Sequence, residues 1–319
     1  MKEIKITDIL DFKIGNAEYN EGPTGCTVII AKEGASAGVD VRGGAPGTRE
    51  TDLLNPINLV DKIHAVLLTG GSAFGLDSAS GVMNYLEEKN IGFDVGVTKV
   101  PIVCGAALFD LIIGDHKIRP DKELGYKACL ESEKNSLEEG NYGAGLGATI
   151  GKVLGPENAM KGGLGTYAVE IGDLMIGAIV AVNALGDIYD SENNKIIAGA
   201  YDKEKGQLLN TESIMTSKYD DKKNLFNGNT TIGAIITNAK LSKAEANKVA
   251  SMAHNGFARS IRPAHSMFDG DTIFVMASGK VEADVNTIGF TAANVMEKAV
   301  VKAIETAKGI EGYIAARDI

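Results

Sequence analysis

Short apolar segments rich in β-branched residues recur along this chain of 319 residues, and they limit the folds open to it. Each segment is short enough to form one buried strand, and none approaches the roughly 18 consecutive apolar residues that a membrane span needs. The predicted strands are Thr27–Ala31, Ala65–Thr69, Val169–Ile171, Met175–Val182, Thr231–Thr237 and Thr272–Ala277. The pattern therefore predicts a protein built around buried β-structure.

Segments with helical spacing lie between and after these strands. They cover Leu76–Leu86, Ser242–Ile261 and Asn286–Ala307. Ser242 begins the second with a capping box, because Glu245 follows it three residues later. Some predicted strands lead into helices and others follow one another directly, so we expect layers of α and β structure, not a pure βαβ repeat.

The length fits either two domains of about 150 residues or one large α/β domain. We expect residues 1–319 to form a single domain. The most polar stretch, Asp202–Asn229, is rich in Lys, Asp, Asn and Gly, and it reads as an exposed loop or linker. It ends where the predicted strand Thr231–Thr237 begins.

Composition and charge exclude several classes of protein. Hydrophobic residues make up 44% and charged residues 23%, which rules out a disordered chain. The 32 basic and 42 acidic residues give a net charge of −10, which argues against nucleic-acid and anionic-membrane partners. Three widely spaced cysteines without a CxxC pair, and an N-terminus without an apolar signal segment, favour a cytoplasmic protein.

The junction between Asn229 and Thr230 is the most informative point of the sequence. A hydroxyl residue stands there at the head of a predicted buried strand, directly after a polar loop. Such a residue can attack the preceding carbonyl and so cut the chain. The freed α-amine of Thr230, with an ordinary pKa of about 7.7–8.0, could then serve as general base for its own hydroxyl. Read alone, the same residues also fit an ordinary turn.

Two carboxylates, Asp269 and Asp271, stand just before the predicted strand Thr272–Ala277. At positions i and i+2 they could point the same way, toward the amine or hydroxyl of Thr230, and orient it. The Asp-Gly-Asp sequence also fits a surface turn. A metal site is a third reading, although two carboxylates are few ligands and no histidine completes the set.

Asn183 and Lys161 are further candidates. Asn183 follows a predicted strand, where its side-chain amide could donate to an oxyanion, although it could also cap a turn. Lys161 precedes two glycines, in a stretch whose main chain could approach a substrate closely. A buried ammonium there would lower the pKa of the Thr230 amine. The alternative for Lys161 is a solvated lysine in a glycine turn. No dinucleotide-binding, P-loop or HExxH motif is present. For a hydrolase that acts through Thr230 we expect neither a cofactor nor a metal.

Seven segments, spread over nearly the whole chain, carry a further signal. They are Gly25–Val28, Val41–Asp52 (VRGGAPGTRETD), Thr69–Asp77 (TGGSAFGLD), Gly143–Ala148, Met160–Thr166, Val182–Asp187 and Gly228–Ala239. In these segments the chain resembles a family of self-cleaving hydrolases, which comprises the L-aminopeptidase/D-esterases, the β-peptidyl aminopeptidases and the nylon-oligomer (6-aminohexanoate-oligomer) hydrolases.

This resemblance implies a four-layer α-β-β-α sandwich like that of the N-terminal-nucleophile hydrolases. It implies self-cleavage into 1–229 and 230–319, with Lys161 and Asn183 at the active site and assembly into tetramers. The aminopeptidase branch usually has a Gly-Ser junction and a Ser-x-Glu pair. Asn229–Thr230 and the Asp-x-Asp of Asp269 and Asp271 are more similar to the nylon-oligomer hydrolase branch.

The expected activity is hydrolysis of small amides through an acyl-enzyme on Thr230. The substrates implied are small peptides, amino-acid amides or esters, β-peptides and 6-aminohexanoate oligomers. Two alternatives stay open at this point. The chain could be an uncut, non-catalytic protein of the same fold that binds a small molecule, or an acyltransferase that passes the acyl group to an amine.

Overall fold

The computed structural model describes residues 1–219 and 228–319. Within these residues, ten strands form one sheet in the order β1-β11-β12-β17-β19-β3-β5-β8-β4, with β2 paired to β3 beside this path. The strands are β1 (Lys2–Ile4), β2 (Lys13–Tyr19), β3 (Thr24–Val41), β4 (Gly47–Arg49), β5 (Lys62–Thr69), β8 (Val103–Ala107), β11 (Gly163–Ile171), β12 (Leu174–Asn183), β17 (Thr230–Ala239) and β19 (Thr272–Val281). All six predicted strands are found among them.

The long strand β3 connects the two halves of this sheet. Its first part pairs with β2 and β5, and its second part pairs with β19. The register with β5 shifts between Ile30 and Ala35, where four residues of β3 stand opposite one residue of β5 and let the strand bend. Because one strand belongs to both halves, the sheet folds over and becomes two β layers.

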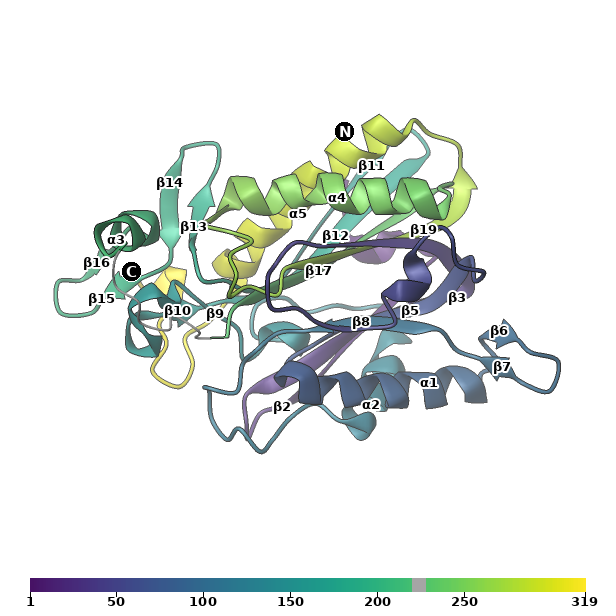
Figure 1. Cartoon of the computed structure of the whole chain (residues 1–319), viewed down its shortest axis with the longest axis horizontal. Coiled ribbons are helices and arrows are strands. Elements are labelled where there is room, and N and C mark those ends of the chain that lie inside the picture. Colours follow the sequence, from purple (N-terminus) through teal and green to yellow (C-terminus); the bar gives the residue numbers. More distant parts are fainter. Residues whose placement is uncertain (220–227) are drawn as a thin grey trace.

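Helices cover both outer faces, which gives four layers (Figure 1). The helices α4 (Lys243–Ser260) and α5 (Val285–Thr306) lie over β11, β12 and β19. On the other side, α1 (Ser78–Glu88) and α2 (Lys122–Ser132) lie over β2, β3 and β8. The predicted α-β-β-α sandwich is therefore confirmed.

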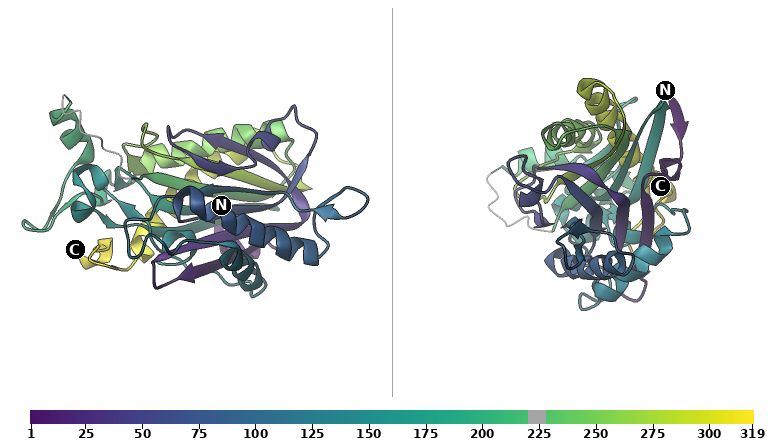
Figure 2. Two further views of the ribbon diagram at one scale, coloured as in Figure 1. Left: turned by 60° about the horizontal axis from the view of Figure 1, so that its bottom comes forward. Right: turned by 90° about the vertical axis from the view of Figure 1, so that its right-hand side faces the viewer.

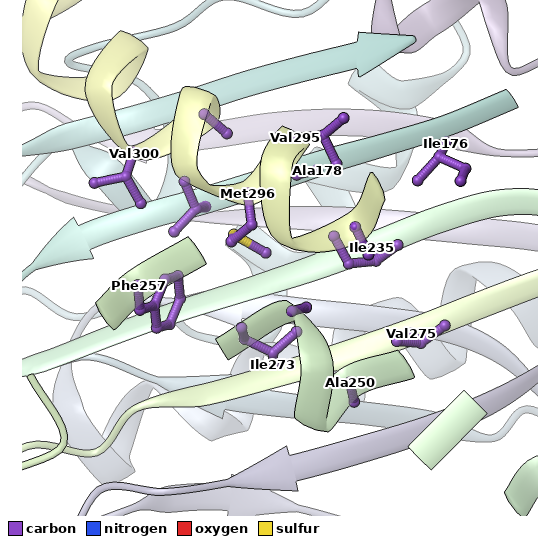
Figure 3. Close-up of a cluster of buried hydrophobic side chains, with 14 of the residues drawn as sticks. Ile176, Ala178, Ile235, Ala250, Phe257, Ile273, Val275, Val295, Met296 and Val300 are labelled. Carbon is purple, nitrogen blue, oxygen red and sulfur yellow. The ribbon is translucent and has the colours of Figure 1, made fainter. Parts of the chain in front are cut away.

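Alternation along the central strand β17 shows how the layers are filled. Ile232, Ala234 and Ile236 point into the core between the two β layers, while Ile235 and Ala239 belong to the core beneath α4 and α5. Side chains on a strand alternate between its faces, so a continuously apolar strand fills two cores at once. Figure 3 shows the second of these cores, where Ile235 lies near Met296 of α5.

The predicted helices are found at the expected places. The capping box of α4 is present, since Ser242 and Glu245 each accept a hydrogen bond from the other's main-chain N–H, at 3.3 and 2.8 Å. Helix α2 was not predicted, although its N-cap Asp121 accepts a hydrogen bond from Leu124 N at 3.0 Å. Its weakly amphipathic sequence gave no clear periodicity.

The stretch Asp202–Asn229 is only partly the exposed loop that its composition predicts. It contains the end of a hairpin, β15 (Tyr201–Asp202) with β16 (Gln207–Leu208), and the helix α3 (Thr211–Ser217). Thr211 is fully buried because its N–H and Oγ1 donate to the buried carboxylate of Asp187, at 2.6 and 2.7 Å. Residues 220–227 of the predicted loop lie outside the described residues.

Smaller strand pairs complete the described part of the chain, and the elements around α3 project from one end of the sandwich (Figure 2). The pairs are β6 (Phe93–Asp94) with β7 (Lys99–Val100), β9 (Thr149–Ile150) with β10 (Met160–Lys161), and β13 (Asp187–Asp190) with β14 (Lys195–Ala198) and β18 (Ile261–Arg262). None of the helices described is both long and apolar enough to cross a membrane.

Candidate active site

The ends of three neighbouring strands meet at the junction between Asn229 and Thr230. β12 runs antiparallel to β17, so its last residue, Asn183, lies opposite Thr230. β19 runs parallel to β17, and a parallel bridge pairs Asn229 with Asp269 just before β19 begins. Sheet topology therefore brings together Asn183, Thr230 and the Asp-x-Asp segment, which are far apart in sequence.

The peptide between Asn229 and Thr230 is buried, with the two residues 2% and 4% exposed. The hydroxyl of Thr230 contacts the carbonyl oxygen of Asn229, and the Gly270 N–H donates to the same oxygen at 3.1 Å. The side-chain amide of Asn229 is buried without a hydrogen-bond partner among the described residues. The hydroxyl and the carbonyl group that it would attack are thus in direct contact.

The side chain of Asn183 is fully buried beside the junction. Its Nδ2 donates to the carbonyl oxygens of Phe109 and Gly228, at 2.9 and 3.1 Å. Its Oδ1 accepts from Thr149 N at 2.9 Å. In this uncut chain the amide hydrogens of Asn183 are therefore directed to two main-chain carbonyls, neither of which is the carbonyl of Asn229.

Lys152 is the lysine that the structure places at the junction. Its Nζ donates to Asn183 O, Asn183 Oδ1 and Gly228 O, at 3.0, 2.9 and 3.1 Å. Complete burial lowers the pKa of this ammonium to about 7, against the opposing effect of the negative charges of Asp269 and Asp110. Lys152 can therefore gain or lose a proton near neutral pH.

Lys161, which the resemblance implies is at the active site, donates its hydrogen bonds to a different part of the chain. Its Nζ donates to the carbonyl oxygens of Gly145, Ala148 and Gly162, at 2.9, 2.9 and 2.8 Å. Burial also lowers the pKa of Lys161 to about 7, opposed by Asp110. It is not a solvated lysine, and none of these hydrogen bonds goes to Thr230 or Asn229: its contacts hold the glycine-rich loop around residues 143–148 together.

Sequence reasoning missed Lys152, although the signal that selected Lys161 applies to it equally. Both lysines stand beside a glycine in an apolar segment, nine positions apart. Only the path of the loops between them decides which ammonium reaches Asn183 and Gly228.

Asp269 is buried in a tight turn, with 2% of its surface exposed. Its Oδ2 accepts from Ser266 N at 2.8 Å and from Ser266 Oγ at 2.5 Å. Burial, together with the nearby negative charge of Asp271, raises the pKa of Asp269 to about 6, while the bonds from Ser266 and the charge of Lys152 oppose this rise. Asp269 therefore changes its charge just below neutral pH.

Asp271, also 2% exposed, contacts the main chain of the residue after Thr230. Its Oδ1 accepts from Thr231 N at 2.8 Å, and its Oδ2 accepts from His265 N at 3.0 Å and lies 2.8 Å from His265 Nδ1. A surface turn does not describe this segment, because both carboxylates are buried. Within residues 1–219 and 228–319, no group of three His, Cys, Asp or Glu side chains is arranged to hold a metal.

A cavity of about 130 Å³ adjoins the junction. Two aromatic residues, Phe109 and Phe268, and several small residues line it. The other lining residues are Ala45, Pro46, Gly47, Ser72, Ala73, Ala107, Gly228, Asn229 and Thr230. Since a water molecule occupies about 30 Å³ in the liquid, this space suits a small chemical group beside the Thr230 hydroxyl.

Comparison with known proteins agrees with this fold. The chain is 38% identical to an uncharacterized aminopeptidase of Mycobacterium leprae, over 96% of this chain and 91% of that protein. It is 32% identical to a 6-aminohexanoate-oligomer endohydrolase of a Kocuria species, over 93% and 84% of the two chains.

Among solved structures, the L-aminopeptidase D-Ala-esterase/amidase of Ochrobactrum anthropi superimposes with a TM-score of 0.73 at 17% identity, covering 98% of this chain and 90% of that one. A β-aminopeptidase of a Burkholderia species gives a TM-score of 0.69 at 18% identity, covering 96% and 87%. These two similarities show the shared fold, which the description of the first calls a variant of the Ntn hydrolase fold.

Fold and relatives together define the class of this protein as a hydrolase of amide bonds. Within that class the chain belongs to peptidase family S58, whose sequence model matches residues 5–317. The resemblance to aminopeptidases and nylon-oligomer hydrolases is therefore confirmed.

Proposed function

We propose that the chain is a self-processing amidohydrolase that cuts itself between Asn229 and Thr230 and then uses the new N-terminal threonine as its nucleophile. One observation carries the proposal: the Thr230 hydroxyl lies against the carbonyl of Asn229 in a buried peptide. A hydroxyl held at its target carbonyl needs little further ordering before it can react.

The cut is an acyl shift followed by hydrolysis. Thr230 Oγ attacks the carbonyl carbon of Asn229, the C–O bond forms, and the C–N bond to Thr230 breaks. The hydroxyl proton ends on the freed amine. Water then hydrolyses the ester, which leaves a carboxylate on Asn229 and restores the Thr230 hydroxyl next to its own α-amine.

Turnover repeats this chemistry on a substrate. The α-amine takes the hydroxyl proton, Oγ attacks the substrate amide, and the leaving amine carries the proton away before water releases the acyl group. A protonated Lys152 would lower the pKa of the Thr230 amine and favour its free-base form. We expect Asp271 to hold the main chain after Thr230, and Asp269 to balance the charge of Lys152.

Asn183 and Lys161 take different parts in this scheme. When the segment that ends at Asn229 leaves, Asn183 loses the Gly228 carbonyl as a partner, and one amide hydrogen becomes free for a substrate. Lys161 holds a loop, and we expect it to act on stability and not on the reaction.

The two fragments should stay together after the cut. The smaller fragment, 230–319, contains β17 and β19, which lie between β12 and β3 of the larger fragment. Separating the fragments would break main-chain hydrogen bonds on both sides of this pair, so they would remain one folded domain.

The proposed substrates are small amides: peptides with a free N-terminus, amino-acid amides or esters, β-peptides and 6-aminohexanoate oligomers. The names of the relatives support this range, and so does a cavity with room for only a small group at Thr230. We also propose a homotetramer of processed subunits in the cytoplasm, where the buried free thiols of Cys26, Cys104 and Cys129 would stay reduced.

The deciding experiment is an intact mass measurement under denaturing conditions on wild type and Thr230→Ala. Wild type should give fragments of roughly 24 and 9 kDa, in proportion to their lengths and average composition, with threonine at the new N-terminus. Thr230→Ala should stay whole and hydrolyse no amide. A single uncut species in both samples would refute the proposal and favour a binding protein. Acyl transfer to an added amine, without hydrolysis, would instead indicate an acyltransferase.

A further inference from the structure

We propose that the main-chain N–H of Gly270 is the oxyanion donor of this enzyme, first for its own cleavage and then for its substrates. The inference rests on the proposed function, since it concerns the same nucleophile. Gly270 is the residue between Asp269 and Asp271 of the Asp-x-Asp segment. The proposed role belongs to its main-chain N–H, so no side chain in the sequence indicates this role.

The first observation is the hydrogen bond itself. Gly270 N donates to the Asn229 carbonyl oxygen at 3.1 Å, and this oxygen gains negative charge when Thr230 Oγ attacks. Gly270, Asn229 and Thr230 are all buried, so the N–H acts in a site shielded from bulk water. In such surroundings a fixed donor stabilises developing charge far better than in solution.

The second observation is that the donor is fixed before the reaction. The peptide unit that joins Asp269 to Gly270 is held at both polar ends: its carbonyl oxygen accepts from Ala45 N at 2.8 Å, and its N–H donates to Asn229. The next carbonyl, that of Gly270, accepts from Thr272 Oγ1 at 2.9 Å. A donor held in this way costs no reorganisation when charge appears.

The third observation explains why position 270 is a glycine. A Cβ there would lie 2.8 Å from Thr230 Oγ and 2.9 Å from the carbonyl oxygen of Ala45. Contacts below 3.0 Å would push the nucleophile or the loop out of place. The glycine therefore lets one main-chain N–H reach the carbonyl oxygen while the nucleophile lies against the same residue.

The donor that sequence reasoning favoured is occupied in the uncut chain. Asn183 Nδ2 donates to Phe109 O and Gly228 O, and Thr230 Oγ is the attacking group itself. In the described part of the chain, the Gly270 N–H is thus the fixed donor to the Asn229 carbonyl oxygen during the first cut.

The same donor serves turnover because the geometry of attack is the same. In the cut, the C–Oγ bond forms, the oxygen carries the charge against Gly270 N–H, and the C–N bond then breaks with transfer of the proton to the amine. A substrate carbonyl attacked by the same Oγ takes the place that the Asn229 carbonyl has left. Its oxygen then faces the same N–H.

The test removes this N–H without adding a side chain, although the ester also makes the Asp269 carbonyl a weaker acceptor for Ala45 N. Glycolic acid in place of Gly270, introduced by nonsense-codon suppression, turns the amide into an ester without adding a Cβ. The matched control is glycolic acid at Gly44, whose N–H donates to Ser266 O at 3.1 Å in the adjoining loop. Each ester loses one hydrogen bond, so both should fold and show similar urea unfolding.

Cleavage is followed by intact mass after a timed incubation of the whole chain. The Gly270 ester should be cut about 10²–10³ times more slowly than wild type, while the Gly44 ester keeps a rate within about threefold. After long incubation, kcat of the cut Gly270 ester on an amino-acid amide should fall by a similar factor, with KM little changed.

Equal cleavage rates for wild type and the Gly270 ester, or equal slowing of both esters, would overturn the assignment of Gly270 as oxyanion donor. The proposed function would then still stand. If wild type itself is never cut, the proposed function fails and this inference fails with it. The outcomes are therefore distinguishable within one experiment.

Discussion

Replacing Lys152 by methionine should slow the self-cleavage about 100-fold, whereas the same replacement of Lys161 should leave its rate nearly unchanged. The two lysines are a natural matched pair. Both are fully buried, both donate three hydrogen bonds to protein oxygens, and burial lowers the pKa of both to about 7. They differ in what they hold: Lys152 holds Gly228 and Asn183, and Lys161 holds the glycine-rich loop.

The magnitude of each effect follows from these contacts. Leaving a buried acceptor without its donor costs about 1–3 kcal/mol, and this cost should be similar at the two sites because the hydrogen bonds are similar in number and length. The kinetic effect should differ. Without Lys152 the carbonyl of Gly228 loses a donor, the Asn229 peptide shifts against Thr230, and a misplacement of about 1 Å costs about 100-fold in rate.

Two measurements separate stability from reaction. Urea unfolding of Lys152→Met and Lys161→Met, each in a Thr230→Ala background that cannot be cut, gives the two losses of unfolding free energy. Intact mass against time, in the background with Thr230 present, gives the two cleavage rates. Near-ultraviolet circular dichroism confirms that both proteins are folded at the temperature of the assay.

The reasoning would be refuted if folded Lys161→Met failed to cut itself while Lys152→Met did so at the wild-type rate. Equal slowing of both variants, in proportion to equal losses of stability, would show that neither lysine acts on the junction directly.

Three further predictions concern pH and the surroundings of the junction. Burial lowers the pKa of Lys161 to about 7 in the folded chain. Between about pH 7 and 10 the unfolded chain therefore binds more protons than the folded chain, so the free energy of unfolding should rise with pH. Urea unfolding of Thr230→Ala should show the free energy of unfolding rising by about 2 kcal/mol more between pH 7 and 9 than that of the double variant Thr230→Ala with Lys161→Met. Equal changes with pH in the two variants would contradict this. Asp271→Asn should slow cleavage roughly 10- to 100-fold by loosening the main chain after the nucleophile, with an unchanged rate by intact mass counting against the role. Gly228→Ala would place a Cβ 2.0 Å from the ring of Phe109 at a φ of 62°, and should slow cleavage at least about tenfold; adding Phe109→Ala should restore part of the rate, whereas purely additive effects would exclude the clash.

Local signals in the sequence were reliable where the structure depends on neighbouring residues. The strand beginning at Thr230 and the helix capped by Ser242 and Glu245 were both predicted correctly, because strand periodicity and capping are short-range properties. Helix α2 and the helix α3 inside the polar stretch were missed. Their stability comes from partners distant in sequence, such as Asp187 for Thr211.

The sequence by itself determined the strands, the long helices and the hydroxyl residue at a strand start, and through its motifs it indicated the family. Only the tertiary structure decided which lysine reaches the junction, which groups Asn183 holds, and that a main-chain N–H of Gly270 lies on the carbonyl of Asn229. The physical reason is that the sequence gives the type of each side chain, whereas the partners of that side chain depend on how β12, β17 and β19 are arranged in the sheet. A main-chain donor carries no residue-specific signal at all, so its role becomes visible only in the folded chain.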